Sequence, residues 1–178
     1  MSLLPICIYP DSVLRRKAER IENIDEQIQC LIDDMIETMH EAPGIGLAAN
    51  QVGRPVRLVV LDVERREPGR GLLVLINPEL VGAAGTTKSE EGCLSIPGYF
   101  AGVVRHQEVV VRALDREGKE IEIAADGLLA ICLQHEMDHL DGKLFIDRIS
   151  RISRDIFKRK WKKKLKEEEG VEAQSCLD

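Results

Sequence analysis

The segment at 127–142 constrains the fold most, because it combines an apolar run with two histidines. The apolar residues of the run are Leu128, Leu129, Ile131, Cys132 and Leu133, and on a helix they would occupy nearly every side. A helix that is apolar on nearly every side belongs in the interior of a protein. The same helix would continue through His135 and His139 and end at Asp141-Gly142, an acceptable C-terminal stop. The sequence therefore predicts a central helix that carries two histidines inwards.

His135 and His139 stand four residues apart, so on a helix they share one face and can both bind one metal ion. Glu136 lies beside the first histidine and could act as a general base on water, as in the H-E-x-x-H pattern of metalloproteases. The alternative is an exposed helix with two solvated histidines. Because buried, unpaired polar groups are costly, the apolar helix before the pair favours a metal site.

A third protein ligand is needed to leave one coordination position open. The metzincin pattern fails, because Gly142 is in place but Phe145 stands where the third histidine should be. Cys93 is a better candidate, since it lies in a loop interrupted by glycine and proline at 91–98. The alternative is that Cys93 is a small buried apolar residue. His40 and His106 are the other histidines of the chain, and neither lies in a recognisable ligand setting.

The segment 44–53 has three glycines and two alanines, so a ligand or another backbone can approach it closely. It has neither the G-K-[ST] nor the G-x-G-x-x-G pattern of phosphate-binding loops. A tight connection between a helix and a strand is the alternative. Gln51 is the side chain there that could donate hydrogen bonds into a pocket.

The remaining elements predict an α+β fold. Apolar residues at helical spacing predict a helix over 25–41, and a further helix is expected over 148–168. Runs rich in β-branched residues predict strands at 56–63, 72–76, 109–114 and 120–123, with a hairpin between the last two. Strands gathered without regular alternation with helices are typical of the α+β class.

Composition places further bounds on the protein. The 178 residues suit one domain, no apolar run approaches the length of a membrane span, and no signal or transit segment is apparent, so we expect a cytoplasmic protein. Five scattered cysteines in such a compartment are expected to be reduced. Residues 148–166 hold ten Lys or Arg and one acid, which gives them a charge of +9. Because the net charge of the chain is −6, the other residues together carry −15.

Three motifs together resemble the signature sequences of the peptide deformylases. Residues 44–51 resemble G-x-G-L-A-A-x-Q, residues 91–95 resemble E-G-C-L-S, and residues 134–142 resemble Q-H-E-x-D-H-L-x-G. An opening Tyr9-Pro-Asp is also typical of that family, and order and spacing agree over roughly 5–150. The resemblance implies antiparallel strands packed around a central helix that carries the metal ligands, followed by a C-terminal helix. It also implies hydrolysis of the N-formyl group of formyl-methionine peptides.

The resemblance assigns a role to each matching residue. Cys93, His135 and His139 would bind one divalent metal ion, Fe(II) in many members, with Zn, Ni or Co also possible. Glu136 would be the acid/base residue, while the Gln51 side chain and the Leu94 backbone N–H would stabilise the oxyanion. The residues expected to contact the substrate, including its methionine side chain, are Gly44, Ile45, Gly46, Glu91, Ile131 and Cys132.

Domain organisation and partners are predicted from the motifs and the charge distribution. We expect a catalytic domain over 1–149 and a basic C-terminal helix and tail over 150–178. The basic residues of 148–166 could dock to ribosomal RNA, where formylated chains emerge. Two other functions remain to be separated: a metallopeptidase cutting internal peptide bonds, and a non-catalytic ribosome-binding module.

Overall fold

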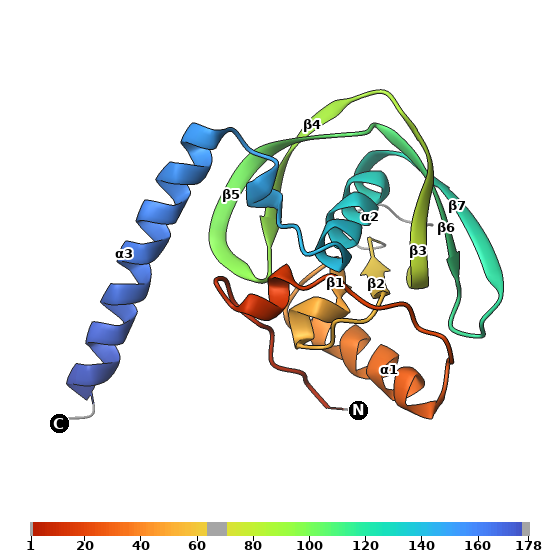
Figure 1. The fold of residues 1–178 in the computed structure, drawn as a ribbon, viewed down its shortest axis with the longest axis horizontal. Coiled ribbons are helices and arrows are strands. Elements are labelled where there is room, and N and C mark those ends of the chain that lie inside the picture. Colours follow the sequence, from red (N-terminus) through yellow and green to blue (C-terminus); the bar gives the residue numbers. More distant parts are fainter. Residues whose placement is uncertain (1, 64–70, 176–178) are drawn as a thin grey trace. The chain divides into compact units, whose positions relative to one another are not determined.

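Figure 1 shows the computed structural model of the protein, which describes residues 2–63 and 71–175. The chain forms two compact units, Met1–Phe145 and Ile146–Asp178. The first unit combines helices with two antiparallel sheets, so the α+β prediction is confirmed. The predicted domain boundary at 149/150 stays a prediction.

The larger sheet has the strand order β1-β2-β3-β6-β7 within the described residues, and every neighbouring pair is antiparallel. Its strands are β1 (Gly46–Ala48), β2 (Leu58–Asp62), β3 (Leu72–Ala84), β6 (Glu108–Leu114) and β7 (Glu120–Ala125). A separate two-stranded ribbon pairs β4 (Thr87–Cys93) with β5 (Ile96–Arg105). The described part of the unit also contains α1 (Glu26–Glu41), α2 (Gly127–Leu140) and the short 3-10 helices Ser12–Arg15 and Ala49–Val52.

Strand β2 has a buried residue on both sides because each face of the sheet is covered by a helix. Val59 and Leu61 belong to the core cluster that includes Leu133 of α2. Leu58 and Val60, which alternate with them, belong to the cluster that includes Met35 of α1. Alternating side chains of a strand point to opposite faces, so the apolar run at 58–61 separates two cores. The apolar residues of α2 contribute to the first of these two cores.

The sequence located the elements with a regular apolar pattern and missed the strands in which that pattern is interrupted. Helix α1 and strands β2, β6 and β7 lie where they were expected, and the helix expected over 148–168 is α3 (Arg151–Ser175). Strand β3 runs eight residues beyond the predicted end at 76. Strands β1, β4 and β5 were not predicted, because glycine and polar residues interrupt their β-branched pattern. These three strands carry or adjoin two of the three motifs.

Helix α3 is the main element of the second unit. Its Phe157 and Trp161 rings lie with centroids 5.5 Å apart, and the Lys164 ammonium lies 4.9 Å from the Trp161 ring centroid. Within residues 2–63 and 71–175, no helix has both the length and the apolar character needed to cross a bilayer.

Candidate metal centre

Residues from β4 and α2 meet at a cluster of three metal-binding side chains. Cys93 ends β4, while His135 and His139 lie one turn apart on α2. One ligand atom from each of the three lies within 4.8 Å of the others. The Cys93 Sγ is 3.2 Å from the His139 Nε2. The two histidines therefore do share a helix face, and the third residue beside them is Cys93. His40 instead pairs through its Nε2 with the Asp62 carboxylate at 2.7 Å.

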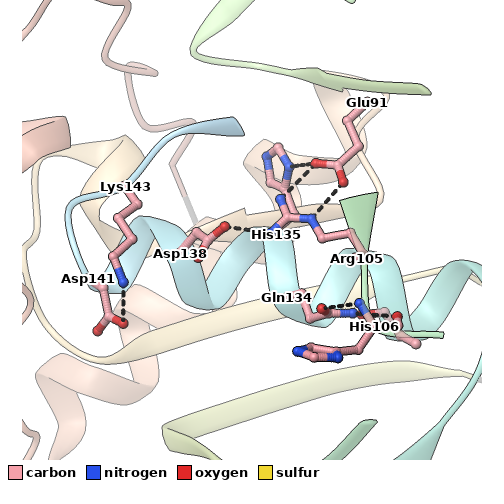
Figure 2. A network of polar contacts seen from close by, with 9 residues as sticks. Glu91, Arg105, His106, Gln134, His135, Asp138, Asp141 and Lys143 are labelled. Carbon is pink, nitrogen blue, oxygen red and sulfur yellow. Dashed lines mark hydrogen bonds and ion pairs between the residues drawn. The ribbon is translucent and has the colours of Figure 1, made fainter. Parts of the chain in front are cut away.

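His135 is held in place by a buried network of charges (Figure 2). Its Nδ1 donates to the Glu91 Oε2 at 2.9 Å, which leaves Nε2 as the nitrogen available for a metal. Arg105 donates to both oxygens of Glu91, at 2.7 and 2.8 Å, and to the Asp138 carboxylate at 2.5 Å. Burial alone would raise the pKa of Glu91, but the hydrogen bonds from Arg105 and His135 overcome it and hold this pKa at about 2. Glu91 is therefore an anion that fixes a histidine ring.

A second contact in Figure 2 fixes the end of β5 to α2. The Gln134 side chain accepts a hydrogen bond from the His106 backbone N–H and donates one to the His106 carbonyl, both at 2.9 Å. His106 follows Arg105 directly, so this pair of hydrogen bonds also holds the Arg105 backbone beside helix α2. These two hydrogen bonds give a structural role to Gln134, the glutamine that precedes the H-E-x-x-H pattern.

Gln51 reaches the cluster from the 3-10 helix Ala49–Val52, and its amide is oriented by the backbone. The Ala48 N–H donates to its Oε1 at 2.9 Å, so the NH₂ group faces the opposite way. That group donates to the Cys93 Sγ at 3.4 Å and to the Ser95 hydroxyl at 3.2 Å. Gln51 is 1% exposed. The buried NH₂ group of Gln51 therefore points towards the Cys93 sulfur.

Glu136 is a buried carboxylate with spare hydrogen-bonding capacity. Its Oε2 has no hydrogen-bond partner within the described part of the chain. Burial raises the pKa of Glu136 to about 7, against the opposing effect of the neighbouring His135. Gly46 makes room for it, since a Cβ at Gly46 would lie 2.6 Å from the Glu136 Oε1 and 2.9 Å from the Cys132 Sγ.

A cavity of about 420 Å³ opens beside these groups, a volume suited to a small ligand or a side chain. It is lined by every site residue predicted from the sequence except His139, namely Gly44, Ile45, Gly46, Gln51, Glu91, Cys93, Leu94, Ile131, Cys132, His135 and Glu136. His139 is completely buried and is not among the residues that line the cavity. The structure therefore brings the whole predicted set to one place.

The donor set fits a divalent transition metal. A thiolate and two imidazoles supply three ligands, which leaves a position for water or substrate. The unpartnered oxygen of Glu136, on the same helix between the two histidines, would have a partner once water occupied that position. Chemically, the arrangement can hold a Lewis acid beside a carboxylate able to exchange a proton near neutral pH.

Residues 3–155 match the family model described as polypeptide deformylase. The chain belongs to this family. A peptide deformylase of Syntrophobacter fumaroxidans is 64% identical over 94% of this chain and 98% of its own, and one of Thermodesulfovibrio yellowstonii is 56% identical over 92% and 99%.

Solved deformylase structures have the same fold. The peptide deformylase of Legionella pneumophila superposes with a TM-score of 0.86 at 46% identity, over 94% of this chain and 98% of that chain. The Ehrlichia chaffeensis enzyme in complex with actinonin gives 0.86 at 45% identity, over 92% and 98%. Each overlap includes nearly all of the chain, so the deformylase fold is shared and not only its motifs.

Several residues of this deformylase site could not be recognised from the sequence. Arg105 and Asp138 complete the charged network, and Ser95 accepts from Gln51. The only available signal was their position within or near the motifs, because their roles depend on β5 lying against α2. The cavity also includes residues that lie outside the three motifs: Pro43, Glu90, Pro97, Gly98, Phe100 and Leu128.

Proposed function

We propose that this metallo-hydrolase removes the N-formyl group from the formyl-methionine of nascent polypeptides and releases formate. The observation that carries the proposal is the meeting of Cys93, His135 and His139 beside the buried Glu136 carboxylate, in a chain of the polypeptide deformylase family. Hydrolysis of an amide needs an activated water, a proton acceptor and donors for the oxyanion, and the cavity has groups suited to each role.

Cys93, His135 and His139 would hold one divalent ion, and Fe(II) is the ion that we propose for the native enzyme. Zn(II), Ni(II) and Co(II) suit the same thiolate and imidazole ligands. A bound ion supplies Lewis-acid chemistry, lowering the pKa of water and polarising the formyl carbonyl. Glu91 supports the site by fixing the His135 ring through its hydrogen bond to Nδ1.

Glu136 is the proton carrier of the proposed reaction. With a pKa of about 7 it can accept a proton from the attacking water and later deliver it to the leaving amine. The Gln51 NH₂ group and the Leu94 backbone N–H donate to the oxygen of the tetrahedral intermediate. Removing one such donor typically lowers the rate by about 10²–10³. Because the Ala48 N–H already fixes the Gln51 amide, little reorganisation is needed.

The cavity accounts for selection of formyl-methionine. Ile45, Ile131 and Cys132 line its apolar part and would receive the methionine side chain. The walls near Gly46 are close, since even one added carbon there would meet Glu136 and Cys132. An acetyl group carries a methyl where formyl has hydrogen, so a wall close to the bound carbonyl carbon would disfavour it. Gly44 and Glu91 complete the proposed substrate-contacting set.

A formate-release assay on formyl-Met-Ala-Ser tests the proposal, using anaerobically prepared Fe(II) protein. We expect turnover with the formylated peptide and none with a peptide that offers only internal bonds, which separates the enzyme from a metallopeptidase. Cys93→Ser should lose metal and turnover together. Cys30→Ser, which changes an exposed thiol of α1, is the matched control and should keep both. Full activity of Cys93→Ser would contradict the ligand assignment.

A second proposal concerns where the enzyme works. We propose that it acts in the cytoplasm and docks to the ribosome through the basic residues 148–166, most of which lie on α3. Lys163 is 79% exposed, and its ion pair with Glu167 at 3.6 Å is a surface contact of small energy. Exposed lysines and arginines on one helix suit RNA phosphates, whose binding depends strongly on salt. This docking would bring the cavity to emerging formylated chains.

A further inference from the structure

Four consecutive residues shortly after helix α1 form one wall of the cavity. Pro43, Gly44, Ile45 and Gly46 all line it, and Ile45 belongs to the part proposed to receive the methionine side chain. The wall lies against another cavity residue, since a Cβ added at Gly44 would be 2.9 Å from the Leu94 Cδ1. Only Gly46 belongs to a strand, β1, so the place of the three residues before it depends on what holds the ends of the loop.

His40 and Asp62 join the two ends of this loop. His40 lies in the last turn of α1, and its Nε2 is 2.7 Å from the Asp62 Oδ2. Because a carboxylate oxygen only accepts hydrogen bonds, the imidazole Nε2 carries the hydrogen and donates it. Asp62 ends β2, and its backbone N–H donates to the Ile45 carbonyl at 2.9 Å. One residue of β2 therefore holds the chain before the loop with its side chain and the end of the loop with its backbone.

The contact lies where α1 leaves the core. Met39 is the last residue of α1 in the buried core, and the Gly44 N–H donates to its carbonyl at 2.9 Å, which ties the loop to the helix but not to the sheet. Within residues 2–63 and 71–175, His40 is the one residue of 40–46 whose side chain hydrogen-bonds to a strand. Helix ends fray because their last carbonyl groups lack partners in the helix. The His40–Asp62 contact therefore fixes a turn that is otherwise prone to open.

We propose that His40 is a positioning residue that, through Asp62, keeps the wall 43–46 in the place where Ile45 receives the methionine side chain. A wall that is fixed before the substrate arrives does not have to be ordered by binding, so the free energy of binding is not reduced by that cost. The inference rests on the proposed deformylase function. It gives a role to a histidine that lies outside the metal-binding cluster and does not line the cavity.

The pair lies partly in solvent, so it can be broken without opening the core. The His40 side chain is 38% exposed and the Asp62 side chain 17%. A contact so close to the surface contributes little to the free energy of unfolding, and His40→Leu should therefore fold as the parent does. The metal-binding cluster and Glu136 lie on other elements, so the expected effect is on binding of the first side chain and not on the chemical step.

The test measures formate release from formyl-Met-Ala-Ser and formyl-Ala-Ala-Ser by metal-loaded full-length protein. For the methionine peptide, His40→Leu should raise KM by about three- to tenfold and leave kcat within about twofold, because the wall must now be ordered on binding. For the alanine peptide, kcat/KM should change by less than about twofold, because a methyl group does not fill the part of the cavity next to Ile45. Loss of stability alone would lower the activity on both peptides and would not change this selectivity.

Two further variants show whether the hydrogen bond is responsible. His40→Gln places an amide N–H donor within reach of Asp62 and should restore KM to within about twofold of the parent. Asp62→Ala removes the side-chain contact but keeps the backbone N–H that holds Ile45, so it should raise KM as His40→Leu does. If the two residues act through one contact, the double variant should be no worse than the more affected single variant.

Gln29→Ala is the matched control, because Gln29 ties the other end of α1 to the β6–β7 hairpin. Its side chain donates to the Arg116 carbonyl at 2.6 Å and accepts from the Arg116 guanidinium at 3.0 Å. This variant should leave both KM and the preference for methionine unchanged.

Three results would overturn the role of His40. They are an unchanged KM in His40→Leu, an equal rise in Gln29→Ala, and a His40→Gln variant as impaired as His40→Leu. If the parent released formate from neither peptide, the proposed function itself would fail, whereas an active parent with any of these three results would refute this inference alone.

Discussion

Helices α2 and α3 both carry many ionisable residues, but they keep them in opposite surroundings. On α2, His135, Glu136, Asp138 and His139 are all at most 9% exposed. On α3, the Lys163 side chain is 79% exposed, and the charges lie on a surface helix that begins at Arg151. A buried charge is costly unless it is paired, while an exposed one costs little and contributes little by itself.

This difference separates two ways in which charge serves function. The charges of α2 act through position, because Glu91 and Arg105 hold individual atoms within hydrogen-bonding distance. The proposed role of α3 depends on the number of charges, since phosphate contacts add roughly uniformly and are weakened by salt. We therefore expect single substitutions to have large effects on α2 and small ones on α3.

The largest expected effect is that of Glu136→Gln. The amide keeps the size of the side chain and its buried place, but it cannot accept the proton from water. We expect kcat to fall by about 10³ or more, with metal content unchanged. Metal analysis and formate release on the same preparation check both parts. Activity within tenfold of the parent would show that another group carries the proton.

Gly46→Ala, a change in strand β1, tests the position of the Glu136 carboxylate of α2 without removing any charge. The added Cβ would lie 2.6 Å from the Glu136 Oε1, so the carboxylate must shift. A misplacement of this size can lower the rate by about 10². Gly102→Ala in β5 is the control, because its Cβ would meet only the flexible end of the Lys88 side chain. Equal kcat for Gly46→Ala and Gly102→Ala would contradict the close fit around Glu136.

Glu91→Gln should lower stability and change its dependence on pH. Breaking a buried ion pair by removing one partner costs about 3–5 kcal/mol. The folded pKa of Glu91, about 2, lies below the ordinary value of 4.5, so its contribution is present above about pH 4.5 and is lost as pH falls towards 2. Urea unfolding from pH 7 to 3 should show this loss in the parent and a flatter profile in Glu91→Gln. Glu90→Gln, which changes an exposed neighbour, should leave the parent's pH dependence in place.

The sequence identified the residues that gather at the cavity better than it predicted the strands around them. Cys93, His135, Glu136 and Gln51 stand in short motifs whose chemistry constrains residue type, so they could be named before any coordinates. Strands β4 and β5 were missed because Gly92, Gly98 and Gly102 interrupt the alternation that marks a strand. Two of those glycines, Gly92 and Gly102, accommodate the Phe100 ring and the Lys88 stem, which only a folded ribbon brings together.

The charged network shows why long-range contacts escape such prediction. Arg105 and Asp138 lie 33 residues apart, and Arg105 looks like any surface arginine until β5 lies against α2. Helical periodicity located α2 because its signal is local. Nothing local distinguishes an arginine that will be 3% exposed from one that will be solvated.

The smallest effect on catalysis is expected from α3. Replacing Lys162, Lys163 and Lys164 together by Gln removes three charges, and kcat/KM for a short formyl peptide should stay within about twofold, because none of the three lines the cavity or belongs to the metal-binding cluster. Binding to ribosomes should weaken, and the slope of log K against log salt should decrease by about one for each phosphate that a lysine no longer neutralises. Replacing Lys17, Lys88 and Lys119, three exposed lysines of the first unit, by Gln makes the same change in net charge away from α3. If both triple variants weakened co-sedimentation equally, net charge rather than α3 would account for the binding. Weaker co-sedimentation of the α3 variant alone, with turnover of the short peptide unchanged, would show that the number of charges on α3 acts separately from their placement on α2.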